Sequence, residues 1–252
     1  MNANPTDWLF DFGNTRLKCA PLVDGRCGEV IALAHDDADF ASKFDALLPR
    51  RGVVAHVASV ASAKRTLDLL ELLAKRFARI DTARTQASRG GVRIAYADPA
   101  KLGVDRFLAL LAAHERGGAT LVVGVGTALT LDLIDAYGQH HGGRIAPSPS
   151  LMREALHARA SVLPLQGGIR VDFASDTADA LASGCEGAAL ALIADGLAAA
   201  RERLGIVPVL LLHGGGAPAL QAALPDSILE PSLVLRGLAC WARLEQSGSE
   251  ST

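Results

Sequence analysis

Two short stretches of this sequence combine the residue types that phosphate chemistry requires. The first begins at Asp11, which follows a run of apolar residues, continues through a small polar turn at Gly13 and ends at Lys18. A turn of this composition presents backbone N–H groups and the hydroxyl of Thr15 to phosphate oxygens. Asp11 could hold a hydrated magnesium ion, and Lys18 adds a positive charge. An ordinary hairpin with a surface acid is the alternative interpretation.

The second stretch, residues 121–131, repeats the first. Gly124 takes the place of Asp11 and lies 113 residues after it, a separation of about one domain, and Gly126 takes the place of Gly13. Two strand–turn–strand loops of this kind predict a duplicated domain that holds a nucleotide in the cleft between its halves. A chance likeness of two glycine hairpins is the alternative. The sequence contains no G-x-x-x-x-G-K-[ST] loop, so the hairpins must form any nucleotide site.

The elements that must position these loops alternate along the chain. Apolar residues at helical spacing, with capping and breaking residues at the ends, predict several helices. They cover about 36–48, 62–76, 107–113, 150–159, 177–203 and 232–246. Buried strands are predicted at 53–60, 77–82 and 207–212, and a turn at 141–145. This alternation indicates an α/β layer fold, and the glycine pair at 117–118 suggests a domain boundary.

Three glycines follow the last predicted strand. Gly214, Gly215 and Gly216 lack side chains, so the backbone here could approach a flat ligand such as an adenine ring. A plain strand-to-helix turn is the alternative interpretation.

Composition excludes several classes of function. The net charge of −2 gives no electrostatic reason to expect nucleic acid or an anionic membrane as a partner. The four cysteines stand at no metal-ligand spacing, which favours reduced thiols. Residues 1–7 lack the features of a signal peptide, and the longest uncharged run, 204–225, contains prolines and glycines that argue against a membrane span. We therefore expect a soluble cytoplasmic protein.

Six motifs, in order along residues 8–245, resemble those of the type III pantothenate kinases. They are Asp11-Phe12-Gly13-Asn14-Thr15-x-x-Lys18, Gly103-Val104-Asp105-Arg106, Gly126-Thr127-Ala128-x-Thr130-x-Asp132, Gly142-Gly143, Asp176-Thr177 with Ser183-Gly184, and Gly214-Gly215. The family belongs to the superfamily of acetate and sugar kinases, heat-shock chaperone ATPases and actin. The resemblance implies two duplicated RNase H-like α/β domains, at 1–117 and 118–252, with a nucleotide cleft between them.

The resemblance also implies an activity, which is transfer of the ATP γ-phosphate to the primary hydroxyl of pantothenate. The product, 4'-phosphopantothenate, is the first intermediate of coenzyme A synthesis. ATP with Mg²⁺ would be the phosphate donor, Asp11 the metal ligand, and the enzyme a homodimer with substrate near the subunit interface. The implied ATP-binding residues are Asp11, Phe12, Gly13, Asn14, Thr15, Arg16, Leu17, Lys18, Gly126, Thr127, Gly214 and Gly215. The implied pantothenate-binding residues are Tyr96, Gly103, Val104, Asp105, Arg106 and Thr177.

Asp105 matches the catalytic base of the family. An aspartate with a pKa of about 4 cannot deprotonate an alcohol in advance, but it can orient the hydroxyl and accept its proton late in the transfer. The alternatives are structural. Asp105 could be a helix-start acid favoured by the helix dipole, Arg106 a surface arginine, and Thr177 a helix cap.

One residue departs from the family pattern. The second hairpin of the family usually begins with an aspartate that helps bind a monovalent cation, K⁺ or NH₄⁺, and this chain has Gly124 there. Potassium should therefore be dispensable or bound mainly by backbone oxygens, unless Asp132 substitutes.

Two other functions compete with pantothenate phosphorylation. The chain could be a related kinase with a sugar or acetate-like acceptor, or a catalytically weak regulatory protein. The presence of Asp11, Lys18 and Asp105 argues against the second.

Overall fold

The computed structural model describes residues 7–35, 37–49 and 51–249. The chain divides into two compact units. Unit 1 combines Met1–Glu115 with Ser232–Thr252, and unit 2 is Arg116–Pro231. The break at 115–116 lies close to the predicted boundary after residue 117. The segment from Ser232 onward returns to unit 1, whereas the predicted second domain included it.

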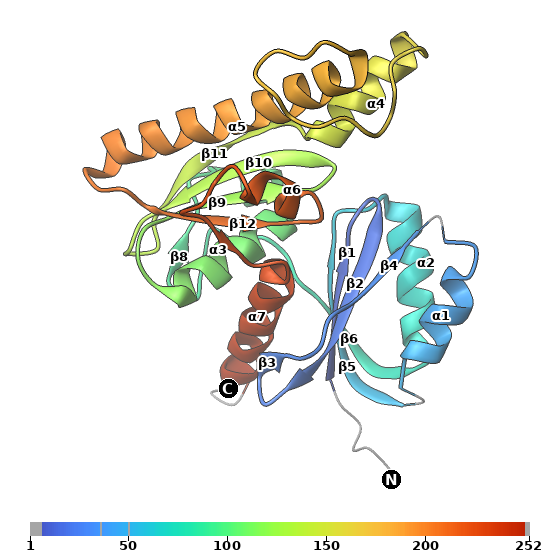
Figure 1. Ribbon diagram of the computed structural model, residues 1–252. Helices are drawn as coiled ribbons and strands as arrows, with labels where there is room; N and C mark the ends of the chain where they lie inside the picture. Colours follow the sequence, from blue (N-terminus) through green and yellow to red (C-terminus); the bar gives the residue numbers. More distant parts are fainter. Residues whose placement is uncertain (1–6, 36, 50, 250–252) are drawn as a thin grey trace. The chain divides into compact units, whose positions relative to one another are not determined.

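The sheet of unit 1 has the strand order β3-β2-β1-β5-β6, and β4 pairs with β2. β1 is antiparallel to β2 and parallel to β5, which is parallel to β6 (Figure 1). The strands are β1 (Asp7–Phe12), β2 (Arg16–Val23), β3 (Arg26–Cys27), β4 (Ile31–Ala34), β5 (Gly52–Ser59) and β6 (Phe77–Thr82). A small two-stranded sheet joins β7 (Ser88–Arg89) to β8 (Val92–Arg93).

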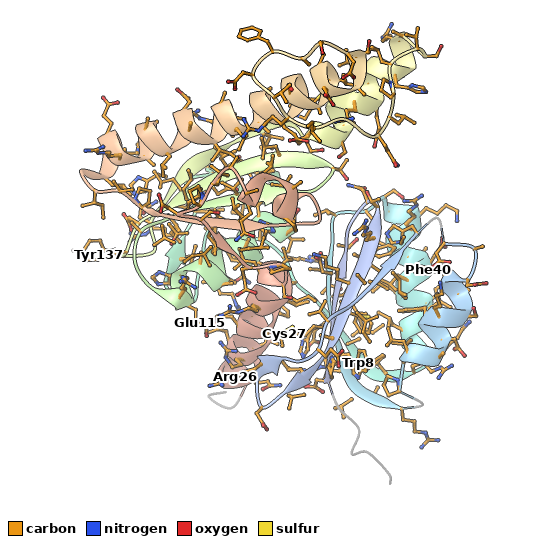
Figure 2. The ribbon with its side chains drawn as sticks, in the orientation of Figure 1. Trp8, Arg26, Cys27, Phe40, Glu115 and Tyr137 are labelled. Atoms are coloured by element: carbon orange, nitrogen blue, oxygen red, sulfur yellow. The ribbon has the colours of Figure 1, made fainter. Side chains whose placement is uncertain are left out.

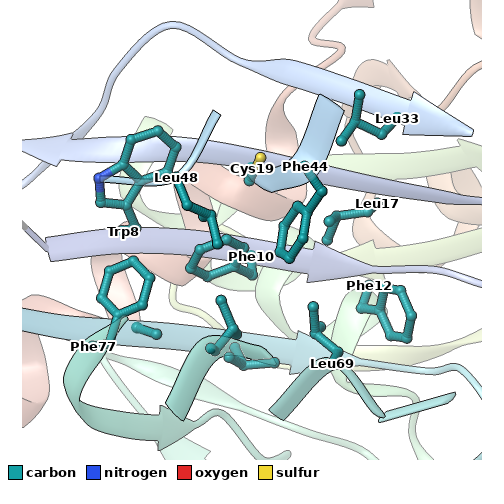
Figure 3. Packing of buried hydrophobic residues seen from close by; sticks show 13 residues of the cluster. Trp8, Phe10, Phe12, Leu17, Cys19, Leu33, Phe44, Leu48, Leu69 and Phe77 are labelled. Atoms are coloured by element: carbon teal, nitrogen blue, oxygen red, sulfur yellow. The ribbon is translucent and has the colours of Figure 1, made fainter. Parts of the chain in front are cut away.

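Alternation along β1 separates a core face from a polar face. Trp8, Phe10 and Phe12 pack with α1 (Phe40–Leu47) and α2 (Ala63–Ala74), as Figure 3 shows for Phe44 and Leu69. Because successive side chains of a strand point to opposite faces, Asp11 lies on the other face of the sheet. The pleat alone therefore keeps this carboxylate out of the aromatic core.

The other face of this sheet meets α7 (Leu233–Ser249), which contacts β1, β2, β3 and β5. α7 also lies very close to α3 (Val104–Arg116), because a Cβ on Gly237 would overlap the carbonyl of Leu108. The buried residues Leu235, Leu238 and Ala242 lie on α7. Burial of this apolar face is the physical reason why the last helix belongs to unit 1.

The sheet of unit 2 repeats the connectivity of unit 1, with the order β11-β10-β9-β12-β13. β9 is antiparallel to β10 and parallel to β12, as β1 is to β2 and β5. The strands are β9 (Thr120–Val125), β10 (Ala128–Ile134), β11 (His140–Pro147), β12 (Val209–His213) and β13 (Ile228–Leu229). Gly124 is the fifth residue of β9 and Asp11 the fifth of β1, so the alignment of the two hairpins holds in three dimensions.

The core of unit 2 lies between this sheet and two helices, α5 (Thr177–Leu204) and α6 (Ala217–Gln221). Leu121, Val123 and Val125 of β9 face this core, so Gly124 faces the opposite side. α4 (Pro149–Arg159) runs beside α5 (Figure 1). The 28 residues of α5 include a window of mean hydropathy 1.3, which would suffice for a membrane span. Residues of α5 within the core nevertheless pack against the sheet, as a core helix does.

One local prediction is wrong. The stretch 141–145 is not a turn but part of β11, since Leu129, Thr130 and Leu131 of β10 pair with Ala146, Ile145 and Arg144. Asp98 caps a 3₁₀ helix of three residues, Pro99–Lys101, and α3 follows from Val104, so this helix is longer than the predicted 107–113.

Candidate active site

The hairpin loop of unit 1, residues 13–15, is held by its own unit. Gly13 N donates to Arg16 O at 3.0 Å. His35 Nε2 lies 2.9 Å from Gly13 O, and Arg65 Nη1 donates to Asn14 O at 3.0 Å. Neither Gly13 nor Asn14 adopts a positive φ. Bonds from distant residues, rather than a left-handed bend, fix this loop.

Asp11 lies near the end of β1, and both a positive and a negative side chain act on it. Lys18 of β2 is its cross-strand partner, so both side chains share one face. Burial raises the pKa of Asp11 to about 7; Lys18 lowers this pKa and the charge of Asp105 raises it. The two carboxylates therefore lie near each other within unit 1.

This arrangement suits a magnesium ion bound together with ATP. Among the described residues, no group of three or more His, Cys, Asp or Glu side chains is placed to hold a metal. Mg²⁺ in phosphoryl-transfer enzymes commonly uses one or two carboxylates plus phosphate oxygens and waters, rather than an all-protein cage. Burial and the nearby charge of Asp105 both disfavour the ionised form of Asp11. A bound cation would stabilise that ionised form.

Asp105 is in the first turn of α3, and its side chain folds back over the preceding loop. Its Oδ1 accepts a hydrogen bond from Arg106 N at 2.9 Å. A Cβ on Gly103 would lie only 2.6 Å from this oxygen, so the absence of a side chain at Gly103 permits the orientation of Asp105. Asp105 is thus a helix-start acid and also a carboxylate fixed near Asp11.

Arg106 is buried, with 6% of its surface exposed, so its interpretation as a surface arginine is wrong. Its Nη1 donates to the hydroxyl of Tyr96 at 3.3 Å, and the guanidinium carbon lies 5.8 Å from the centre of the tyrosine ring. A guanidinium held by an aromatic residue is suited to bind a carboxylate in fixed orientation.

The hairpin of unit 2 is also stabilised by distant residues. Gly126 N donates to Ala128 O at 2.9 Å, and the buried Ser148 donates from Oγ to Thr127 O at 2.9 Å. The predicted nucleotide glycines lie next to this hairpin, since Gly216 N donates to Val125 O at 3.0 Å. Gly214 has φ +94°, and a Cβ there would overlap the Val125 carbonyl. Glycine is therefore required for this loop to reach the end of β9.

Gly124 is flanked by polar side chains from both neighbouring strands. Its partners in register are Thr130 of β10 and His213 of β12. Asp132 of β10 lies further from the hairpin and is buried, with Oδ1 3.0 Å from Nε2 of the buried His140. This pairing argues against Asp132 as a substitute for the missing aspartate.

The predicted site residues divide between the units. Unit 1 holds the first hairpin, from Asp11 to Lys18, together with Tyr96, Gly103, Val104, Asp105 and Arg106. Unit 2 holds Gly126, Thr127, Gly214, Gly215 and Thr177. Thr177 is the exposed first residue of α5, whose N-terminus is capped by the side chain of Asp176. The cap is thus the neighbour of Thr177 and not Thr177 itself.

Comparison with known proteins identifies the family. The family model described as type III pantothenate kinase matches residues 8–199. The chain belongs to this family. A type III pantothenate kinase of Stenotrophomonas maltophilia (strain R551-3) is 57% identical over 96% of this chain and 100% of its own length. One from Xanthomonas campestris pv. campestris (strain B100) is 56% identical over 94% of this chain and 97% of its own.

Solved structures confirm the predicted fold class of the kinase. A protein titled a conserved putative Baf family transcriptional activator from Campylobacter jejuni has a TM-score of 0.62 at 18% identity and covers 96% of this chain and 99% of its own. A putative 2-dehydro-3-deoxygalactonokinase from Sinorhizobium meliloti has a TM-score of 0.55 at 16% identity and covers 93% and 97%. The fold is α/β with two units, and the matching sheets of the two units agree with the predicted duplication.

The family relationship confirms the predicted enzyme class, an ATP-dependent kinase that phosphorylates pantothenate in coenzyme A synthesis. The sequence analysis missed the residues that position the site in this pantothenate kinase. His35, Arg65 and Ser148 bond to hairpin carbonyls from 22, 51 and 21 residues away. No local sequence pattern predicts hydrogen bonds between residues so far apart in the chain. Only Ser148, which precedes Pro149 and caps α4, carried a recognisable helix-start signal.

Proposed function

We propose that the two hairpins bind the triphosphate of ATP and that Asp105 acts on the pantothenate hydroxyl. The observation that carries this proposal is the placement of Asp11, Lys18 and Asp105 within one unit, close enough for the charges of Lys18 and Asp105 to shift the pKa of Asp11. Unit 1 contributes Asp11 to Lys18, and unit 2 contributes Gly126, Thr127, Gly214 and Gly215. The adenine ring lies against the glycine loop.

Each residue of unit 1 has a distinct role in the proposed mechanism. Lys18 compensates phosphate charge, and Asp105 orients the primary hydroxyl and accepts its proton as the bond to phosphorus forms. Asp11 holds Mg²⁺, which would neutralise charge on the phosphate oxygens. Because transfer passes through a loose transition state, positioning contributes more than basicity.

Pantothenate carries a carboxylate at the end opposite its primary hydroxyl. We assign this carboxylate to Arg106, whose guanidinium is oriented by Tyr96. Gly103 and Val104 lead into α3 just before Arg106, and we assign their backbone to the pantothenate site as well. Thr177 donates its hydroxyl to a substrate oxygen from the start of α5.

A coupled assay of purified protein with pantothenate, ATP and magnesium tests the proposal. Formation of 4'-phosphopantothenate should saturate with both substrates and should be equal with and without potassium. A preference for a sugar or acetate-like acceptor would contradict it, as would the absence of turnover with any acceptor. Strong, saturable activation by potassium or ammonium would contradict the expected cation independence.

We also propose that the kinase is a cytoplasmic homodimer that binds neither nucleic acid nor membranes, in keeping with its net charge of −2. The connection between α4 and α5 exposes apolar side chains, namely Val162, Leu165, Ile169 and Phe173. Its backbone is fixed, since Arg153 Nη1 donates to Gly167 O at 2.9 Å and Val171 N to Ser183 Oγ at 2.9 Å. A rigid apolar loop of this kind suits a subunit interface.

Replacing Phe173 by aspartate should convert the dimer into monomers, because its side chain is 99% exposed and would otherwise be buried in the partner. Sedimentation of wild type and F173D measures the mass. Tyr137→Asp is the control. Tyr137 is 88% exposed and projects from the turn between β10 and β11 (Figure 2). An unchanged dimer in F173D, or dissociation in both variants, would contradict this interface.

A further inference from the structure

The side of the unit 2 sheet that faces away from α5 and α6 carries a histidine next to the second hairpin. His213 is the last residue of β12 and lies opposite Gly124. The next residue, Gly214, belongs to the loop that closes around the Val125 carbonyl. The imidazole is therefore anchored where β9 ends and the hairpin begins.

The imidazole and the hydroxyl of Thr130 together fill the space that a side chain at position 124 would need. A Cβ on Gly124 would lie 2.7 Å from Thr130 Oγ1, 2.9 Å from His213 Nε2 and 3.1 Å from His213 Cε1. Cβ atoms do not approach heavy atoms so closely, so an aspartate could enter only if both the Thr130 hydroxyl and the His213 ring moved. The residues present do not fit a cation site built on a carboxylate at this position.

The two units differ in the charged or polar side chain that they place at the end of the first hairpin strand. In unit 1 the fifth strand residue is Asp11, and its neighbour on the parallel strand is the small Ala58. In unit 2 the fifth strand residue is Gly124, and the neighbour on the parallel strand is His213. A carboxylate next to phosphate needs a cation between the two anions, whereas an imidazole N–H can donate to a phosphate oxygen directly.

We propose that His213 binds a phosphate group of the nucleotide and replaces the monovalent cation at the second hairpin. This inference rests on the proposed function in one respect, the binding of a nucleoside triphosphate at the hairpins. It adds a binding residue that the motif comparison did not contain, and it gives a physical reason for cation independence.

Binding of a non-hydrolysable ATP analogue with magnesium, measured by calorimetry, tests the role of His213. His213→Ala should raise the Kd by about 10- to 100-fold, the range for a hydrogen bond to a charged group. His213→Gln, which keeps an N–H donor, should recover part of the loss. His141→Gln is the control, since His141 lies at the far end of the sheet and pairs with Asp135 at 2.9 Å. Affinities of both His213 variants within twofold of wild type would overturn the proposal.

The double variant G124D/H213A tests whether the ring occupies the place of the cation. Removing the imidazole leaves only the hydroxyl of Thr130, the end of a rotatable side chain, against the new carboxylate. Potassium should therefore tighten analogue binding in the double variant and leave wild type unaffected. An equal response in wild type, or no response in the double variant, would overturn the replacement. Thermal unfolding of each variant shows whether it is folded.

These measurements contain no pantothenate. If the pantothenate assay failed, the binding experiment on His213 could therefore still be interpreted. Conversely, pantothenate turnover combined with unchanged analogue affinity in both His213 variants would refute only the role of His213.

Discussion

Replacing Asp105 by asparagine lowers kcat for pantothenate phosphorylation by about 10²- to 10⁴-fold, the usual contribution of a positioned general base. The KM for ATP stays within a few-fold of wild type, because the proposed ATP contacts lie on the hairpins. Asparagine keeps an oxygen that can accept the hydrogen bond from Arg106 N, so α3 begins as before. Steady-state kinetics with both substrates measures the two effects separately.

Asp98→Asn is the matched control for this variant. Asp98 is exposed and caps the short 3₁₀ helix just before α3, where its Oδ1 accepts from Ala100 N at 3.0 Å. Its replacement tests the loss of an acid in the same segment, and we expect near-wild-type turnover. Near-wild-type kcat in D105N would refute the catalytic role. An equal fall in both variants would point to damage of the segment.

The second large effect is expected at Asp11, where asparagine should abolish most magnesium-dependent turnover and also stabilise the metal-free protein. Loss of the carboxylate removes the proposed metal ligand, and loss of comparable electrostatic stabilisation costs about 10²- to 10³-fold in kcat. Stability changes in the opposite direction because burial raises the pKa of Asp11 from 3.8 to about 7.

The sign of this stability change follows from proton linkage. A carboxyl with a raised pKa in the folded state favours folding below its unfolded pKa and loses that contribution as the pH rises through the folded value. Wild type without metal should therefore lose stability between about pH 4 and pH 7 relative to D11N. The difference at pH 8 is at most about 4 kcal/mol, from about 1.4 kcal/mol per pKa unit.

Chemical unfolding of both proteins at pH 5 and pH 8, with and without Mg²⁺ and the ATP analogue, measures this difference. The ligands should stabilise wild type more than D11N. Asp68→Asn is the control, since Asp68 is an exposed acid of α2 paired only on the surface with Lys64. Its stability change should not depend on pH in this way. A D11N protein no more stable than wild type at pH 8 would refute the burial penalty.

The hairpins show what sequence could predict about the site. Asp11 and Gly124 occupy the same place in two equivalent sheets. The sequence repeat, in which an apolar run, a small polar turn and a second apolar run follow one another, indicated this correspondence. Alternation along each strand also fixed which side chains face the core. These features are local, because a strand points its side chains to alternate faces whatever lies beyond it.

Other parts of the site depend on contacts between different elements, which the sequence pattern does not predict. The burial of Arg106 beside Tyr96 and the approach of His213 to Gly124 each join residues from different elements. The return of α7 to unit 1 is similar, because this helix follows unit 2 in the chain and yet packs with unit 1. No local pattern distinguishes between such partners.

The sequence by itself determined the family, the two hairpins and the positions of the carboxylates, because these are set by residue type and short-range order. Only the tertiary structure decided which charges surround Asp11 and which side chain fills the space over Gly124. The physical reason is that desolvation, charge coupling and steric exclusion act over a few ångströms in space. Chain folding brings residues within that range irrespective of their separation in sequence.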